Sequence, residues 1–163
     1  MKTRRVALLG MLAGLAMILS YVESQIPNPV PIPGVKLGLA NMAVVFALYS
    51  LGFREAGMIS LVRVGMVSIL FGSGVSLLYS LAGAALALCT MGLLRRTDKF
   101  TPVAVSVAGG VMHNVGQILV ACLLLSRNLF FYYLPFLLLS GTVCGAAIGV
   151  VSGILVERVK IGR

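Results

Sequence analysis

Three polar side chains occur within five positions of an apolar run, in the segment GGVMHNVGQIL at 109–119. His113 and Gln117 are four residues apart and share one helical face, and Asn114 lies close to that face. Two interpretations are open. The side chains form hydrogen bonds between helices, worth roughly 0.6 kcal/mol each in a membrane, or they contact a polar ligand in space left by neighbouring glycines. A lone histidine argues against a metal site, and we expect no cofactor.

A second candidate is Arg63, which follows Glu55 by eight residues, or about 12 Å along a helix. An arginine so deep in an apolar segment costs several kcal/mol unless it faces a cavity or a partner. Of the four acidic residues, only Glu23 is placed to reach it. Arg63 is therefore either a structural partner of Glu23 or of helix backbone, or it is the receptor for an anionic ligand.

Three further residues belong to the candidate ligand site. Asn41 and Tyr79 are polar residues within apolar runs, and Lys36 precedes the run that contains Asn41. Lys36 could attract an anion at the entrance of a pocket. The candidate substrate-binding residues are thus Arg63, His113, Asn114, Gln117, Asn41, Tyr79 and Lys36.

The elements that must position these residues are membrane helices. Only 10% of the 163 residues are charged, 60% are apolar, and the mean hydropathy is +1.07. A soluble domain has about 25% charged residues, so we expect an integral protein of a cell membrane with the lipid bilayer around it. The net charge of +9 does not indicate a nucleic-acid partner, because the basic residues lie at the ends of apolar runs.

The apolar runs predict an all-α, polytopic membrane protein with a single domain, a bundle of six transmembrane helices. The predicted helices cover about 5–24, 37–51, 55–71, 75–94, 103–126 and 130–156. The first run resembles a signal peptide but lacks a small-residue cleavage site, so we interpret it as an uncleaved helix. Prolines at 27, 29, 31 and 33 make the first connection stiff and extended. Ten lysines and arginines flank the predicted inner side and two the outer side, so both termini should be cytoplasmic.

Small residues recur on two of the predicted helices. The first carries Gly10, Ala13 and Gly14, which suit either packing inside the bundle or docking to a membrane partner. The last carries glycines at 141, 145, 149 and 153, a four-residue stripe that predicts tight packing within the bundle.

Catalytic motifs are missing from the sequence. There is no paired-carboxylate motif for magnesium and diphosphate, no G-x-x-x-x-G-K-S/T loop and no G-x-S-x-G turn. We therefore predict no catalytic residues. If the chain moves a solute against a gradient, a partner or an ion must supply the energy.

The segments PGVKLGLANMAVVFALYSLGFREA, ILFGSGVSLLYSLAG and VAGGVMHNVGQILVA resemble the Gx transporter family, whose members carry the label heptaprenyl diphosphate synthase component I. The family is similar to the substrate-binding S components of energy-coupling factor transporters of prokaryotes. The resemblance implies six helices, substrate binding near the outer face, and docking through the first helix to a T component with two ATPases. The resemblance also implies that docking uses an A-x-x-x-A pattern on the first helix. This chain has Gly10-x-x-x-Gly14 in its place.

Two functions follow as hypotheses. The first is a substrate-binding membrane subunit that takes up a small polar or anionic nutrient or vitamin-like precursor. The alternative is an accessory membrane component of heptaprenyl or polyprenyl diphosphate synthesis. Prenyl elongation needs aspartate clusters that bind magnesium, and this chain has a single aspartate, Asp98. The chain could therefore not catalyse that reaction alone.

Overall fold

The computed structural model describes residues 2–25, 38–72, 74–124 and 128–159, and every regular element in these ranges is an α-helix. The predicted all-α class is confirmed, and each predicted boundary lies within four residues of the observed one. The helices are α1 (Lys2–Gln25), α2 (Asn41–Ser50), α3 (Phe53–Phe71), α4 (Gly74–Arg96), α5 (Pro102–Leu124) and α6 (Asn128–Arg158).

Four helical stretches are long and apolar enough to cross a membrane: Thr3–Gln25, Gly74–Arg96, Pro102–Leu124 and Leu134–Arg158. Helix α2 has ten residues, about 15 Å of helix, which is half the thickness of a bilayer core. Helix α3 is longer but carries Arg54, Glu55 and Arg63. The structure thus supports a membrane protein with four candidate spans, and six complete spans stay a prediction.

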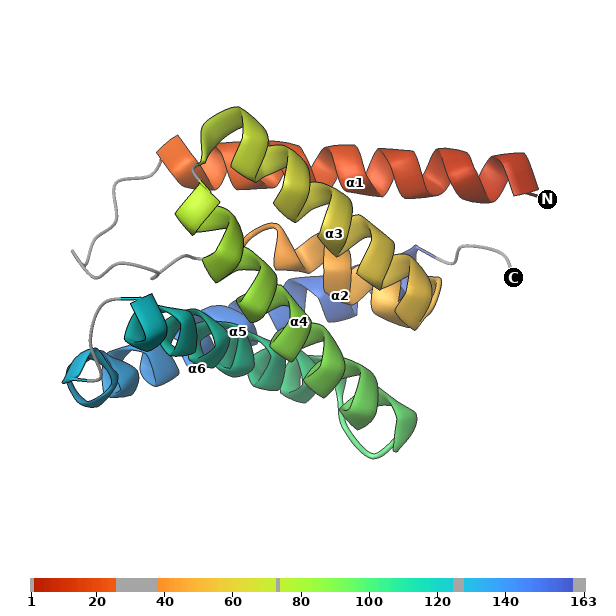
Figure 1. The fold of residues 1–163 in the computed structure, drawn as a ribbon. Coiled ribbons are helices and arrows are strands. Elements are labelled where there is room, and N and C mark those ends of the chain that lie inside the picture. The colour runs from red at the N-terminus through yellow and green to blue at the C-terminus, as the bar shows by residue number, and fades with distance from the viewer. Residues whose placement is uncertain (1, 26–37, 73, 125–127, 160–163) are drawn as a thin grey trace.

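Helix α2 lies inside the bundle (Figure 1), where it contacts α1, α3, α5 and α6. The other helices pack in series, α1 on α3, α3 on α4, α4 on α5 and α5 on α6. All residues of α2 from Ala43 to Leu48 are buried. A helix that is apolar on every side is stable only when it is surrounded. The central position of this short helix is what places its first residue, Asn41, in the interior.

Helices α5 and α6 touch through glycines. A Cβ atom at Gly110 would lie 2.6 Å from the carbonyl oxygen of Gly141. Cβ atoms at Gly145 and Gly149 would lie 2.8 and 2.7 Å from Cα atoms of α5. Only residues without side chains allow backbones to approach so closely. The prediction that the glycine stripe of the last helix packs within the bundle is confirmed for these three glycines.

The small residues of α1 do not form close backbone contacts of this kind. Gly10 is exposed and Ala13 and Gly14 are half-buried. A Cβ atom at either glycine would meet no atom within 4 Å. Apolar side chains on the same helix are exposed too, Met11 by 65% and Ile18 by 61%. Close packing inside the bundle therefore does not explain Gly10 and Gly14, and their role in docking to a partner stays a prediction.

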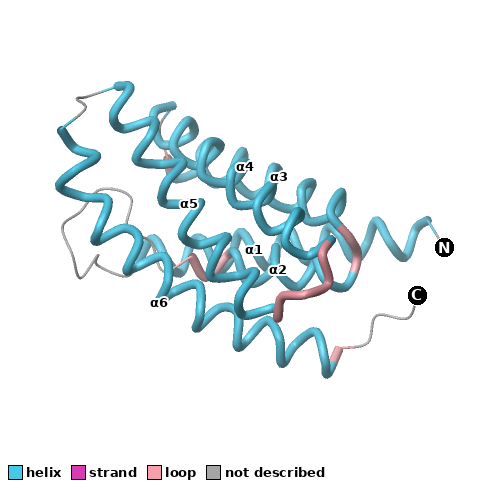
Figure 2. The backbone as a smooth tube through the Cα atoms, turned by 90° about the horizontal axis from the view of Figure 1, so that it is seen from below, coloured by secondary structure: helices cyan, strands magenta, loops and turns pink. Residues whose placement is uncertain are grey.

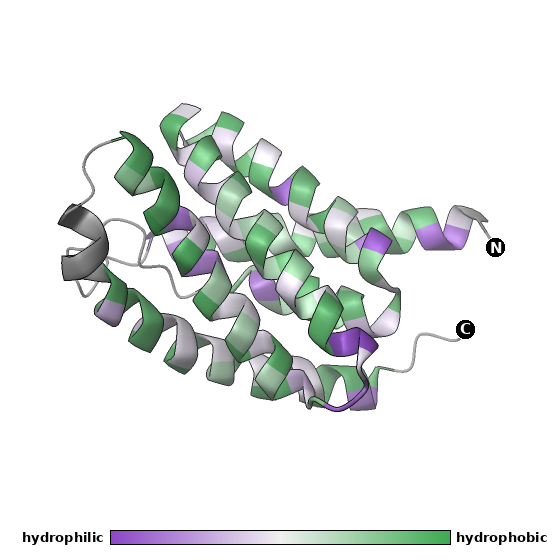
Figure 3. Cartoon of the chain, turned by 60° about the horizontal axis from the view of Figure 1, so that its bottom comes forward, coloured by the Kyte–Doolittle hydropathy of each residue, from purple (hydrophilic) through white to green (hydrophobic). Residues whose placement is uncertain are grey.

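The first helix begins and the last helix ends at the same end of the bundle (Figure 2). Hydrophilic residues gather at this end, whereas apolar residues cover most of the helices (Figure 3). Arg5 forms an ion pair with Glu55 there. Arg95 donates a hydrogen bond to the carbonyl oxygen of Tyr49 at 3.0 Å, and its guanidinium lies 5.0 Å from the centre of the Tyr49 ring. The cytoplasmic location of this end stays a prediction.

Candidate functional site

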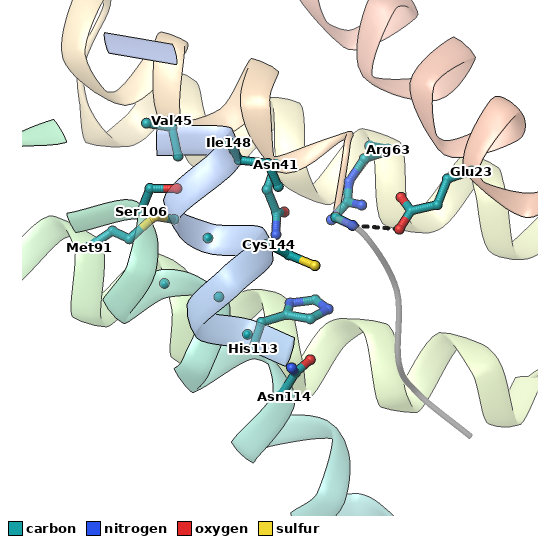
Figure 4. Close-up of a pocket in the computed structure, with 15 residues that line it drawn as sticks. Glu23, Asn41, Val45, Arg63, Met91, Ser106, His113, Asn114, Cys144 and Ile148 are labelled. Carbon is teal, nitrogen blue, oxygen red and sulfur yellow. Dashed lines mark hydrogen bonds between the residues drawn. The ribbon is translucent and has the colours of Figure 1, made fainter. Parts of the chain in front are cut away.

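A pocket lies at the first turn of α2, between α1, α3, α5 and α6 (Figure 4). Its volume is about 40 Å³, which is room for about three water molecules. All six helices contribute to its lining, which consists mainly of polar and small residues with a few apolar ones. The lining residues are Glu23, Gly38, Asn41, Val45, Arg63, Met91, Ser106, Gly109, Gly110, His113, Asn114, Gly141, Cys144, Gly145 and Ile148.

Arg63 and Glu23 point toward each other at one side of the pocket (Figure 4). The carboxylate of Glu23 attracts the guanidinium of Arg63. The Nε atom of Arg63 is buried and has no hydrogen-bond partner among the described residues. The structure thus brings Glu23 to Arg63, as the first interpretation of Arg63 requires, and leaves one donor of the guanidinium unused.

The carboxylate of Glu23 also joins α1 to the start of α2. The backbone N–H of Gly38 donates a hydrogen bond to Glu23 Oε1 at 2.5 Å, the dashed line in Figure 4. Gly38 has a φ of +74°, a conformation that other residues rarely adopt. Its carbonyl oxygen then accepts a hydrogen bond from the N–H of Asn41 at 2.8 Å. The negative charge of Glu23 lies at the positive end of the α2 dipole, which is favourable.

His113 and Asn114 reach the pocket from α5. The imidazole of His113 packs against Gly83 of α4, where an added Cβ would lie 2.9 Å from the ring. The amide of Asn114 donates hydrogen bonds to the carbonyl oxygen of Leu137 at 2.7 Å and to Ser140 Oγ at 3.3 Å. Asn114 therefore connects α5 to α6, as the interpretation of hydrogen bonds between helices predicts, and also lines the pocket.

The remaining predicted residues lie elsewhere. Gln117 is buried, with 3% of its surface exposed, but it does not line the pocket. It follows His113 by one helical turn, about 6 Å along the axis. Tyr79 belongs to α4, whose contribution to the pocket is Met91, about 18 Å further along that helix. Lys36 lies outside the described residues.

Several lining residues were not predicted as contacts. Glu23 was foreseen only as a partner of Arg63. Cys144, Ser106 and Met91 look like ordinary members of apolar runs, so the sequence offers no signal for them. The glycines at 141 and 145 carried a signal, because Cys144 follows Gly141 by three residues and therefore lies beside the glycine stripe on the helix surface. That spacing could have drawn attention to Cys144.

The chemical groups that line the pocket are suited to binding a polar molecule. Within the described residues, no group of three His, Cys, Asp or Glu side chains is placed to hold a metal ion. The pocket instead offers a guanidinium, a carboxylate, an imidazole and two amides around a small space. Such groups recognise a polar molecule by hydrogen bonds and charge.

The family model described as heptaprenyl diphosphate synthase component I matches residues 12–155. The chain belongs to this family. The match covers every pocket residue and the central parts of all six helices. No curated protein matches the chain, and no solved structure does.

Proposed function

We propose that this protein is a membrane-embedded binding component that holds a small polar molecule in the pocket at the start of α2. The convergence of Glu23, Asn41, Arg63 and His113 on one space carries the proposal. These residues come from four different helices. Polar groups in a membrane interior are costly unless they are partnered. Pairwise bonds between helices would meet that need without bringing the groups to a shared space.

The state of Arg63 supports the same proposal. A guanidinium has five N–H donors, and Nε of Arg63 has no acceptor among the described residues although the atom is buried. A ligand oxygen beside it would remove the cost of this unsatisfied donor, which is roughly 1–3 kcal/mol. The positive charge of Arg63 favours one orientation of a charged ligand, which neutral amides alone would not do.

Membership of the heptaprenyl diphosphate synthase component I family supports an accessory role in polyprenyl diphosphate synthesis. The four acidic residues of the chain do not form the cluster that magnesium and diphosphate need. Glu55 pairs with Arg5, and Glu23 binds the N–H of Gly38. Asp98 and Glu157 are exposed, Asp98 after α4 and Glu157 at the end of α6. In this role the chain is the membrane component, and a separate subunit carries out the chemistry.

The second role is uptake, in the manner of an S component. The pocket supports it, because a binding subunit needs an enclosed polar site inside a helical bundle. The exposed face of α1 around Gly10 and Gly14 would then dock to a T component that couples to ATPases. This role places the protein in a prokaryotic cell membrane as a subunit energised by its partner.

Binding itself is tested first. The protein is purified in lipid nanodiscs, and small molecules that co-purify are identified by mass spectrometry. Arg63→Ala and His113→Ala should remove the ligand, whereas Gln117→Leu should retain it, because Gln117 is buried outside the pocket. If the two pocket variants keep the same ligand at the same occupancy as the wild type, the pocket is not the binding site.

The two roles are separated by reconstitution. In an accessory role, adding the purified protein to a catalytic prenyltransferase subunit changes the rate or the product chain length, and Arg63→Ala reverses the change. In an uptake role, proteoliposomes that also contain a T component and its ATPases accumulate the identified ligand when ATP is supplied. A protein that binds a ligand but fails both assays would contradict both roles.

A further inference from the structure

The charged side chains that line the pocket balance each other. Arg63 carries a positive charge and Glu23 a negative one. Both of these side chains lie at the same side of the pocket, where they point toward each other (Figure 4). Among the described lining residues, Arg63 and Glu23 therefore place one full charge of each sign beside the pocket, and these two charges sum to zero.

This balance restricts the charge of a ligand, because unpaired charges in a membrane interior are strongly unfavourable. A monovalent anion beside Arg63 would give the occupied pocket a net charge of −1, and a monovalent cation beside Glu23 would give it +1. A diphosphate would make it more negative still. A zwitterion adds no net charge and offers each of the two side chains a partner of opposite sign.

Arg63 and Glu23 are each available to such a ligand. The ion pair found among the described residues joins Arg5 to Glu55 at the far end of the bundle, so Glu23 attracts Arg63 across a gap. The hydrogen bond from Gly38 N–H holds one oxygen of Glu23 in place. On the other side, Nε of Arg63 is buried without an acceptor. A fixed carboxylate and an unused guanidinium donor thus face one small space.

The size of that space limits the ligand further. Room for about three water molecules restricts the ligand to a molecule of a few non-hydrogen atoms. From charge and size together, we infer that the pocket binds a small zwitterion of about the size of glycine or β-alanine. Its carboxylate pairs with Arg63 and its ammonium with Glu23. The inference rests on the proposed binding function and specifies the class of ligand.

Four matched probes test the charge rule: glycine, glycinamide, acetate and acetamide. Glycinamide and acetate each lack one of the two charges of glycine, and acetamide lacks both. They are added at equal concentration to the protein in nanodiscs, with β-alanine and its three analogues as a second set, and the thermal unfolding midpoint is measured. We expect glycine or β-alanine to raise the midpoint, and its singly charged analogues to raise it much less.

Two substitutions change the charge balance, the isosteric Glu23→Gln and Arg63→Gln. Glu23→Gln gives the pocket a net charge of +1, so acetate should bind about tenfold more tightly than to the wild type, while the zwitterion binds less tightly. Arg63→Gln should lose the zwitterion and acetate alike. Glu157→Gln is the matched control, because Glu157 is exposed on α6 and does not line the pocket. Gel filtration establishes that each variant is folded. If a variant is not folded, the response of the wild-type protein to the four probes decides whether the charge rule holds.

The outcomes distinguish this inference from the proposed function. If acetate or acetamide binds the wild type as tightly as glycine does, and Arg63→Gln abolishes that binding, the protein binds a small polar molecule but the charge rule is wrong. If no zwitterion of either set binds, the inference fails. If in addition no small molecule co-purifies with the protein, the proposed function fails as well.

Discussion

Replacing Gly149 with alanine tests the close packing of α5 on α6. A Cβ atom at Gly149 would lie 2.7 Å from the Cα atom of Val103. Carbon atoms in ordinary contact are about 3.5–4.0 Å apart. The two helices would therefore have to separate by roughly 0.8–1.3 Å at this point. The obstacle is backbone, so no rotation of a side chain can relieve the contact.

The expected loss of stability follows from two opposing effects. Overpacking of this kind costs about 1–3 kcal/mol, and the higher helix propensity of alanine returns up to about 1 kcal/mol. Gly153→Ala is the matched control, because Gly153 continues the same stripe on the same helix. An added Cβ there would meet only Pro102 Cβ, at an ordinary 3.8 Å. The propensity gain is common to both variants, so the difference between them isolates the packing cost.

That difference is about 1–3 kcal/mol. At roughly 2–4 °C per kcal/mol for a chain of this size, Gly149→Ala should unfold about 2–12 °C below Gly153→Ala. The assay is circular dichroism at 222 nm during heating, with both variants in one detergent and each monodisperse on gel filtration. If Gly149→Ala unfolds at the same temperature as Gly153→Ala or above it, α5 and α6 do not approach as the structure has them.

Three other substitutions make separate predictions. Glu23→Gln should lower the unfolding midpoint more than Glu157→Gln does, because it leaves the partly buried Arg63 without a counter-charge, and adding Arg63→Gln should restore part of the loss in the same heating assay. Asn114→Ala removes hydrogen bonds to α6 worth roughly 0.6 kcal/mol each, so calorimetry should record a fall of only a few degrees. Arg5→Gln should change the stability by less than about 1 kcal/mol, because its side chain is 59% exposed. A larger effect that persists in high salt would contradict that assignment.

The sequence predicts the helices well because their ends coincide with changes in polarity. Charged residues follow α4 and precede α5, and the prolines before residue 34 separate α1 from α2. The start of α2 is the exception, since the apolar pattern predicts residue 37 and the helix begins at Asn41. Its start depends on the turn at Gly38 and on the hydrogen bond from Gly38 to Glu23. That contact spans fifteen residues of sequence, so local patterns do not contain it.

Part of the site was also predictable from the sequence. Arg63 could be matched to Glu23 because the chain has only four acids and the others lie near the opposite end. Helical spacing also placed His113 and Asn114 together. The same spacing placed Gln117 on the helical face of His113 and Asn114. A shared face does not show how far along the axis of α5 the pocket extends. The pocket ends within one turn of Asn114, so Gln117 falls beyond it, and the position of this limit depends on how α2 packs.

One wall of the pocket is formed by the close contact of α5 with α6. Gly110, Gly141 and Gly145 line it and also form the backbone contacts between α5 and α6. At Gly110 and Gly145 the two backbones are in direct contact, so the helices cannot approach further there and can separate only by losing this packing. The opposite side of the pocket contains Glu23 of α1 and Gly38, which take no part in the contact between α5 and α6. A ligand larger than the present cavity must therefore gain space from α1 and the turn at Gly38. Because Glu23 binds the N–H of Gly38, entry of a ligand on that side requires this hydrogen bond to break or to move with the ligand.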